Sequence, residues 1–170
     1  MKIRKIKPDE LDAVASIEAA CFPPEEAASP KQIKERYRVF PECFWGAEDE
    51  KGRLVGFVDG CMTDRPTLPD SFYADPACHQ KDGAWQTVFG LNVLPEYRHQ
   101  KIATHLMMEM ISESDRRGKK GVVLTCKDHM MPFYDSLGFR WRGVSASTHG
   151  GAKWNDMLLV FHEEDLPPLE

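Results

Sequence analysis

The stretch YRHQKIAT, residues 97–104, separates a short apolar run from an amphipathic helix. The run before it is VFGLNVL, residues 88–94, which is short and typical of a strand. The apolar pairs that follow at helical spacing are Ile102 and Ala103, Leu106 and Met107, and Met110 and Ile111. A strand that turns tightly into a helix leaves backbone N–H groups unpaired at the helix N-terminus. Together with the helix dipole, these groups form an anion site.

Basic side chains lie beside these N–H groups. Arg98, His99 and Lys101 add positive or potentially positive charge, in a chain whose formal net charge is −5. This local basicity favours a polyanionic ligand. From spacing alone, the alternative is an ordinary strand–helix connection with solvated basic residues.

Length and composition limit the class of protein. The 170 residues predict one domain, residues 1–170, long enough to bury a core. No apolar stretch approaches the roughly 20 residues that span a bilayer, and the basic N-terminus lacks the apolar segment of a signal peptide. We therefore expect a cytoplasmic protein that binds no membrane. The acidic balance argues against nucleic acid as a partner.

The five cysteines are scattered and form no CxxC pair. Neither a disulfide framework nor a zinc site is indicated, so we expect no metal and reduced thiols. Cys126 ends an apolar run and is interpreted as a buried structural thiol.

Hydrophobic periodicity predicts a mixed α/β sheet with helices on its faces. Strands are expected at residues 1–7, 44–48, 53–62, 88–94, 121–126, 139–144 and 156–162, with a hairpin turn at 49–52. Helices are expected at 8–22, from 30 onward, at about 102–116 and at 129–137, and a long loop at 63–83. Ser29 with Gln32 predicts a capping box, Asp128 the cap of the short helix, and Gly138 its end. The acidic loop 23–28 is either a solvated connection or an attraction for a cationic substrate.

Two segments resemble a known family. Residues 91–103, LNVLPEYRHQKIA, are similar to the acetyl-CoA-binding motif of the GNAT superfamily of N-acetyltransferases, whose core is Arg/Gln-x-x-Gly-x-Gly/Ala. Arg98 and Ala103 fit that core, whereas Lys101 replaces the first glycine. Residues 126–139, CKDHMMPFYDSLGF, look especially like the arylalkylamine N-acetyltransferases. With the loop at 21–27 and the hairpin at 44–59 in the same order, the resemblance covers residues 1 to about 161.

The resemblance implies a fold, a co-substrate and binding residues. The fold is the GNAT fold, an α/β (α+β) architecture with a mixed, mostly antiparallel central sheet flanked by helices on both faces. Acetyl-CoA is the implied co-substrate, with its pantetheine along the strand and its pyrophosphate on the turn. The implied cofactor-binding residues are Leu91, Asn92, Val93, Arg98, His99, Gln100, Lys101, Ile102, Ala103 and Thr104. Lysine at 101 either still serves the phosphates or weakens cofactor binding.

Acetyl transfer to an amine needs a deprotonated amine, donors for the oxyanion, and a proton or donor for the departing thiolate. Tyr134 matches the family's tyrosine, and a phenol of pKa about 10 suits the last role. From the residues alone, Tyr134 is better explained as a core aromatic of the short helix, and it is the resemblance that favours the catalytic role.

The general base is not marked. The subgroup's two histidines correspond to Thr87 and Phe89, and neither side chain is a base. The remaining candidates are Glu25, Glu26, Asp59, His79, His129 and His149. An amine of low pKa would need little help.

The leading hypothesis is therefore a small primary amine, acetylated by direct attack in a ternary complex. Phe22 and Glu25 are the candidate substrate residues. The alternatives are a peptide or protein N-acetyltransferase and a non-catalytic acyl-CoA-binding sensor. The chain is expected to be a monomer or a homodimer.

Overall fold

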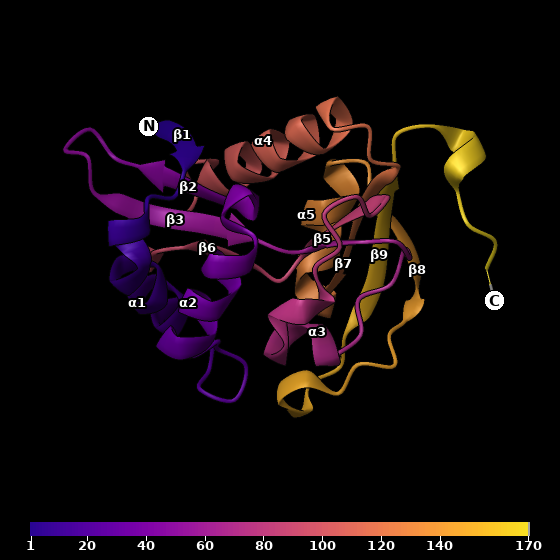
Figure 1. The fold of residues 1–170 in the computed structure, drawn as a ribbon, viewed down its shortest axis with the longest axis horizontal. Coiled ribbons are helices and arrows are strands. Elements are labelled where there is room, and N and C mark those ends of the chain that lie inside the picture. The colour runs from indigo at the N-terminus through magenta and orange to yellow at the C-terminus, as the bar shows by residue number, and fades with distance from the viewer. Residues whose placement is uncertain (170) are drawn as a thin grey trace.

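The computed structural model describes residues 1–169 (Figure 1). The strands are β1 Lys2–Lys5, β2 Phe44–Glu48, β3 Leu54–Asp59, β4 Met62–Thr63, β5 Trp85–Val88, β6 Gly90–Val93, β7 Gly121–Cys126, β8 Arg140–Val144 and β9 Asn155–Val160. The α-helices are α1 Leu11–Cys21, α2 Pro30–Val39, α3 Ser71–Ala74, α4 Ile102–Arg116 and α5 Met131–Ser136. The expected loop at 63–83 is confirmed, with the short α3 inside it.

The strands form two sheets. The first has the order β1-β2-β3-β6 and is antiparallel throughout, and the second has the order β4-β5-β7-β9-β8. Within the second sheet, β5 pairs with β7 in parallel and the other pairs are antiparallel. This confirms the expected α/β fold with mixed, mostly antiparallel pairing.

The two sheets separate at Phe89. The single strand predicted over 88–94 is wrong, because β5 pairs with β7 while β6 pairs with β3 of the other sheet. The strand predicted over 53–62 likewise ends at Asp59 and resumes as β4. Gly60 permits this crossing, since a Cβ there would lie 2.0 Å from the carbonyl oxygen of Thr87. A continuous apolar run carries no mark of where a strand changes partner.

Because β6 is the last strand of the first sheet, its outer edge is open. Val55 accepts a hydrogen bond from the N–H of Leu94 at 2.9 Å, which fixes the register of β3 against β6. In antiparallel pairing, alternate residues point their backbone groups outward. Those residues on β6 are Leu91 and Val93. Because β6 belongs to the first sheet and β7 to the second, the two strands do not pair, and a wedge-shaped space opens between them.

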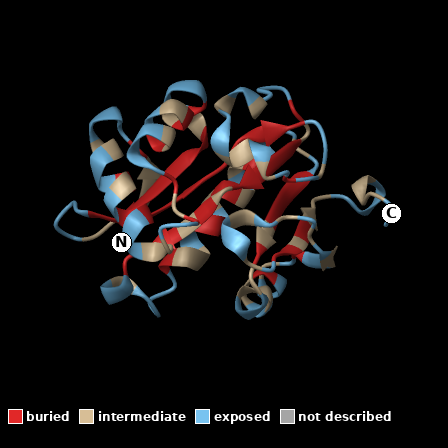
Figure 2. Cartoon of the chain, turned by 90° about the horizontal axis from the view of Figure 1, so that it is seen from below, coloured by how far each residue is buried: buried red, intermediate tan, exposed pale blue. Residues whose placement is uncertain are grey.

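Helices cover both faces of the first sheet. In Figure 1, α1 and α2 lie on one side of its strands, and α4 crosses the other side. Figure 2 shows that buried residues gather on the strands and that the outer helix surfaces are exposed. The largest fully buried side chains include Phe40, Phe44, Trp45, Phe57, Leu106, Met107, Met110, Leu124 and Phe139. Each contributes about 1.5–3 kcal/mol by leaving water.

Of the three predicted helix ends, the capping box at Ser29 and the end at Gly138 are confirmed, and the cap at Asp128 is wrong. Ser29 Oγ accepts from the N–H of Gln32 at 3.1 Å, and Gln32 Oε1 accepts from the N–H of Ser29 at 2.8 Å. Asp128 does not cap the short helix, because its carboxylate accepts from Asn155 Nδ2 at 2.8 Å and pairs with Lys153. Gly138, with φ of +94°, follows α5 as expected. Within residues 1–169, no helix combines the length and apolar character needed to cross a membrane.

Candidate active site

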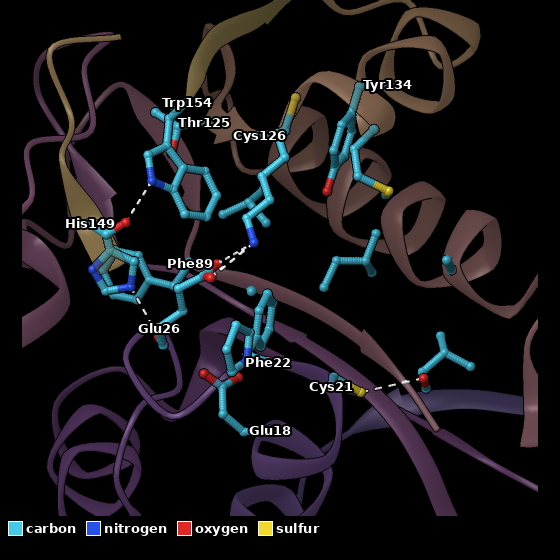
Figure 3. A pocket seen from close by; sticks show the side chains of 18 of the residues that line it. Glu18, Cys21, Phe22, Glu26, Phe89, Thr125, Cys126, Tyr134, His149 and Trp154 are labelled. Carbon is cyan, nitrogen blue, oxygen red and sulfur yellow. Dashed lines mark hydrogen bonds and ion pairs between the residues drawn. The ribbon is translucent and has the colours of Figure 1, made fainter. Parts of the chain in front are cut away.

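A cavity of about 570 Å³ occupies the wedge where the two sheets separate. Figure 3 shows Glu18, Cys21 and Phe22 on one side of it and Cys126 and Tyr134 on the other. The first three come from the end of α1, and the last two from β7 and α5. Elements of both halves of the fold therefore build this site.

The open edge of β6 forms one wall. Leu91 and Val93 line the cavity, whereas the side chain of Asn92 is buried in the core. The Val93 carbonyl oxygen accepts from Arg98 Nε at 3.1 Å and from Cys21 Sγ at 3.4 Å. It therefore faces outward, and an extended ligand could pair with this edge as an added strand would.

The turn between β6 and α4 contains two residues in the left-handed region. His99 has φ of +64° and Lys101, the N-cap of α4, has φ of +63°. A residue with a Cβ costs roughly 1–2 kcal/mol in this conformation, which glycine adopts freely. The chain thus keeps the glycine backbone of the motif although lysine occupies it. The first-turn N–H groups of α4 have no partner within the helix, as the anion site requires.

The predicted cofactor-binding residues divide into three groups. Leu91, Val93, Arg98, His99 and Ala103 line the cavity. Gln100 and Lys101 are exposed and Thr104 is half-buried, and none of the three lines the cavity. The side chains of Asn92 and Ile102 are buried, so only their backbone groups are available to a ligand.

Tyr134 is both a core residue and a cavity residue. Its ring contacts Phe133 and Phe139 edge-on, with centroids 5.1 and 5.5 Å away. Burial raises the pKa of Tyr134 above its usual 10, so the phenol stays protonated at neutral pH. Burial also raises the pKa of the neighbouring Cys126 to about 11, which keeps that thiol protonated and favours the structural interpretation.

Aromatic side chains enclose the far end of the cavity. Tyr73 stacks on His149 with centroids 4.6 Å apart, and Trp154 donates its indole N–H to the His149 carbonyl at 2.8 Å. Phe22 and Phe89 line the same space. Figure 3 shows His149 and Trp154 at the end opposite Cys21. These surfaces suit an apolar group of limited size.

Within the acidic loop 23–28, the Glu26 side chain is buried in an ion pair rather than solvated. Both carboxylate oxygens of Glu26 lie against Lys127 Nζ, at 2.8 and 2.9 Å, and the side chain is 4% exposed. Its carbonyl oxygen also lies 3.0 Å from His149 Nε2. Glu25, the predicted substrate residue, is exposed and lies outside the cavity lining, whereas Phe22 lines it.

The structure separates the candidate bases. His129 and His149 line the cavity. His79 lies elsewhere, between Phe40 and Glu42. Asp59 is fully buried against Arg36 at 3.3 Å outside the lining, and burial raises its pKa to about 6. Thr87 is buried and donates to the Cys61 carbonyl at 3.0 Å.

Sequence reasoning missed Glu18. This carboxylate lines the cavity from the last turn of α1 and is 5% exposed. Its Oε2 accepts from the N–H of Ala28 at 2.9 Å. Burial, reinforced by Asp59, raises the pKa of Glu18 to about 7. The available signal was its position on the same helix face as Val14 and Cys21, where an unpaired acid is out of place.

The site thus combines two sheets that separate around a cavity, an open strand edge in one wall and the N-terminus of α4 beside it. The model of the acetyltransferase (GNAT) family matches residues 11–139, and the chain belongs to this family. It is therefore an acetyltransferase, as the sequence predicted.

Individual proteins show the same likeness. Serotonin N-acetyltransferase of Mesocricetus auratus is 25% identical over 160 residues, covering 92% of this chain and 75% of that protein. The loading GNATL domain of CurA from Lyngbya majuscula has a TM-score of 0.80 at 15% identity, covering 94% and 96% of the two chains. The GphF GNAT-like decarboxylase in complex with isobutyryl-CoA has a TM-score of 0.78 at 21% identity, covering 95% and 100%. The two structures share the fold.

Proposed function

We propose that this chain transfers the acetyl group of acetyl-CoA to the primary amine of a small molecule, by direct attack in a ternary complex. The cavity between β6 and β7 carries this proposal. One wall is an open strand edge, which suits an extended arm, and the far end is enclosed by aromatic rings, which suits a compact amine. The similar GphF structure holds isobutyryl-CoA, an acyl-CoA, and this supports the choice of co-substrate.

The residues present fit acetyl-CoA. The outward backbone groups of Leu91 and Val93 would pair with the pantetheine arm, replacing Arg98 and Cys21 at the Val93 carbonyl. The N–H groups of residues 102–104 would receive the pyrophosphate. When bound, acetyl-CoA supplies the activated thioester.

Tyr134 is the proposed acid. Its pKa is raised, so its proton is retained until a stronger base forms beside it. The thiolate that leaves acetyl-CoA is such a base when it forms in a buried site, because burial disfavours its charge. Tyr134 then donates to sulfur and later regains a proton from the amine through solvent.

Hydrogen bonds and an ion pair join three loops across the aromatic end of the cavity, and this favours a small amine over a peptide. The Asp70 carboxylate, in the 63–83 loop, accepts from the Ser147 hydroxyl and from the N–H of Thr148 at 3.0 Å. Glu26 joins the α1–α2 loop to Lys127 and to His149. A peptide needs an open groove, whereas these contacts tie the segments around the acceptor end together.

A thiol-release assay with acetyl-CoA and a panel of small amines and lysine-containing peptides tests this function. We expect turnover with small amines and a loss of about 10²-fold or more in Tyr134→Phe. Tyr37→Phe is the matched control, because Tyr37 donates to the Ile6 carbonyl away from the cavity. Turnover with peptides alone would contradict the small-amine proposal. Acetyl-CoA binding without turnover on any acceptor would indicate the sensor.

A further inference from the structure

We infer that Glu18 is the general base that accepts the proton of the substrate ammonium. This inference rests on the proposed function and supplies the group that the sequence did not mark. It concerns a buried carboxylate in the cavity wall that no part of the reaction above uses.

The position of Glu18 is the first argument. A Cβ placed on Gly90 would lie 3.3 Å from Glu18 Oε1, so this oxygen lies directly against the first residue of β6. At this residue the two sheets separate and the open edge begins. The carboxylate therefore lies at the head of the edge along which the co-substrate arm is proposed to run.

The hydrogen bonding of Glu18 is the second argument. Oε2 accepts from the N–H of Ala28, and this bond fixes the orientation of the side chain. Oε1 lies beside the Asn92 side-chain amide and keeps a lone pair for a ligand or for one bridging water. Among the carboxylates that line the cavity in residues 1–169, Glu26 is held on both oxygens by Lys127. Glu18 has no such ion pair. Its hydrogen-bond donors are the Ala28 N–H and the Asn92 side-chain amide, so the carboxylate keeps lone pairs that can accept a proton.

The charged and titratable groups around Glu18 come from three elements. Arg36 on α2 favours its ionised form, Asp59 on β3 disfavours it, and Cys21 lies one turn further along α1. Burial is the largest influence, and the pKa of Glu18 lies at about 7. A carboxylate with this pKa exchanges protons near neutral pH, which is the range in which a general base is most effective.

The step balances in atoms and charge. The ammonium gives one proton to the Glu18 carboxylate, directly or through a water, and becomes a neutral amine. The nitrogen lone pair forms the N–C bond to the acetyl carbon as the C–S bond breaks. Tyr134 protonates the sulfur and is reprotonated by the second amine proton through solvent. Glu18 then releases the proton that it accepted to solvent. The sum is ammonium plus acetyl-CoA giving acetamide, CoA thiol and one proton.

Glu18→Gln is the test, because glutamine keeps an oxygen for the Ala28 N–H. With a strongly basic alkylamine we expect kcat/KM at pH 7 to fall about 10²-fold or more. In the pH profile of kcat/KM, the limb that rises through pH 7 should disappear. With an arylamine that is already neutral at pH 7, we expect a fall of only about threefold, since no proton needs removal. Glu26→Gln is the matched control, because it makes the same charge change in the same cavity. It should keep the rising limb of the pH profile of kcat/KM.

The outcomes separate this inference from the proposed function. Suppose that the wild type acetylates amines. If Glu18→Gln keeps the rising limb of the pH profile, or if its kcat/KM falls equally with the alkylamine and the arylamine, Glu18 has a structural role only and the proposed function stands. If wild type acetylates no amine, the proposed function fails and the inference with it. Carboxyl-carbon NMR of the wild type gives a readout without turnover: titration of Glu18 near pH 7 supports the inference, and titration below pH 5 overturns it.

Discussion

Lys127 Nζ lies between the two carboxylate oxygens of Glu26, at 2.8 and 2.9 Å, and 5.6 Å from the centre of the Trp154 ring. The chain thus places its own ammonium in an acidic and aromatic enclosure at the end of the cavity where the amine is proposed to bind. The pair joins the α1–α2 loop to the end of β7, so we expect its removal to change both stability and substrate preference.

Lys127→Met should lower stability. Glu26 is 4% exposed and would remain buried without its cation, which costs roughly 3 kcal/mol. Glu26→Gln in the same background should recover most of this loss, because no charge is then left unpaired. Urea unfolding of the two single variants and the double variant measures the coupling. If the loss in the double variant equals the sum of the two single losses, the pair contributes no interaction energy.

Lys127→Met should also change substrate preference. Glu26 would then be free to pair with the second ammonium of a diamine. We expect the kcat/KM ratio of putrescine to butylamine to rise about tenfold, which corresponds to about 1.4 kcal/mol. Lys153→Met removes the exposed partner of Asp128 and serves as the matched control. An unchanged ratio would show that Glu26 does not face the bound amine.

Lys101→Gly should stabilise the chain. Lys101 has φ of +63°, and glycine removes a strain of about 1 kcal/mol there, less the entropy that glycine adds to the unfolded chain. We expect Tm to rise by about 1–3 °C. Lys153→Gly, at an exposed residue without positive φ, should not raise Tm. Acetyl-CoA affinity, measured by calorimetry, should improve; an equal or weaker affinity would show that lysine does not compromise the turn.

Stability should fall as pH rises from about 4.5 through 7. The pKa of Glu18 is raised from 4.5 to about 7 and that of Asp59 from 3.8 to about 6. In this range the folded state binds more protons than the unfolded state, so deprotonation favours unfolding. For Glu18 the shift corresponds to roughly 3 kcal/mol. Glu18→Gln should flatten the profile of unfolding free energy between pH 5 and 8, and an unchanged slope would contradict this assignment.

Local sequence patterns predicted most of the elements. The capping box of Ser29 and Gln32 and the glycine after the short helix depend on nearby residues, and both formed as expected. Asp128 also had the local signal of a cap. Its carboxylate instead accepts from Asn155 of β9, a partner 27 residues away that no local rule includes.

The candidate site was only partly predictable. Arg98 and Tyr134 belong to motifs with recognisable spacing, and both line the cavity. Glu26 was placed in a loop that is either a solvated connection or an attraction for a cationic substrate, and its ion pair went unpredicted because Lys127 lies 101 residues further along the chain. Glu18 went unmarked because an acid on an amphipathic helix is common, and its burial depends on β6 and the loop at Ala28.

The sequence by itself determined the family, most of the order of strands and helices, and the position of the turn before α4. These features follow from periodicity, capping and motif spacing, which act over a few residues. Only the tertiary structure decided where the strand at Phe89 changes sheets, which charges meet across the cavity, and which carboxylate remains unpaired there. Those properties depend on desolvation and on contacts between distant segments, and both arise only once the two sheets are packed together.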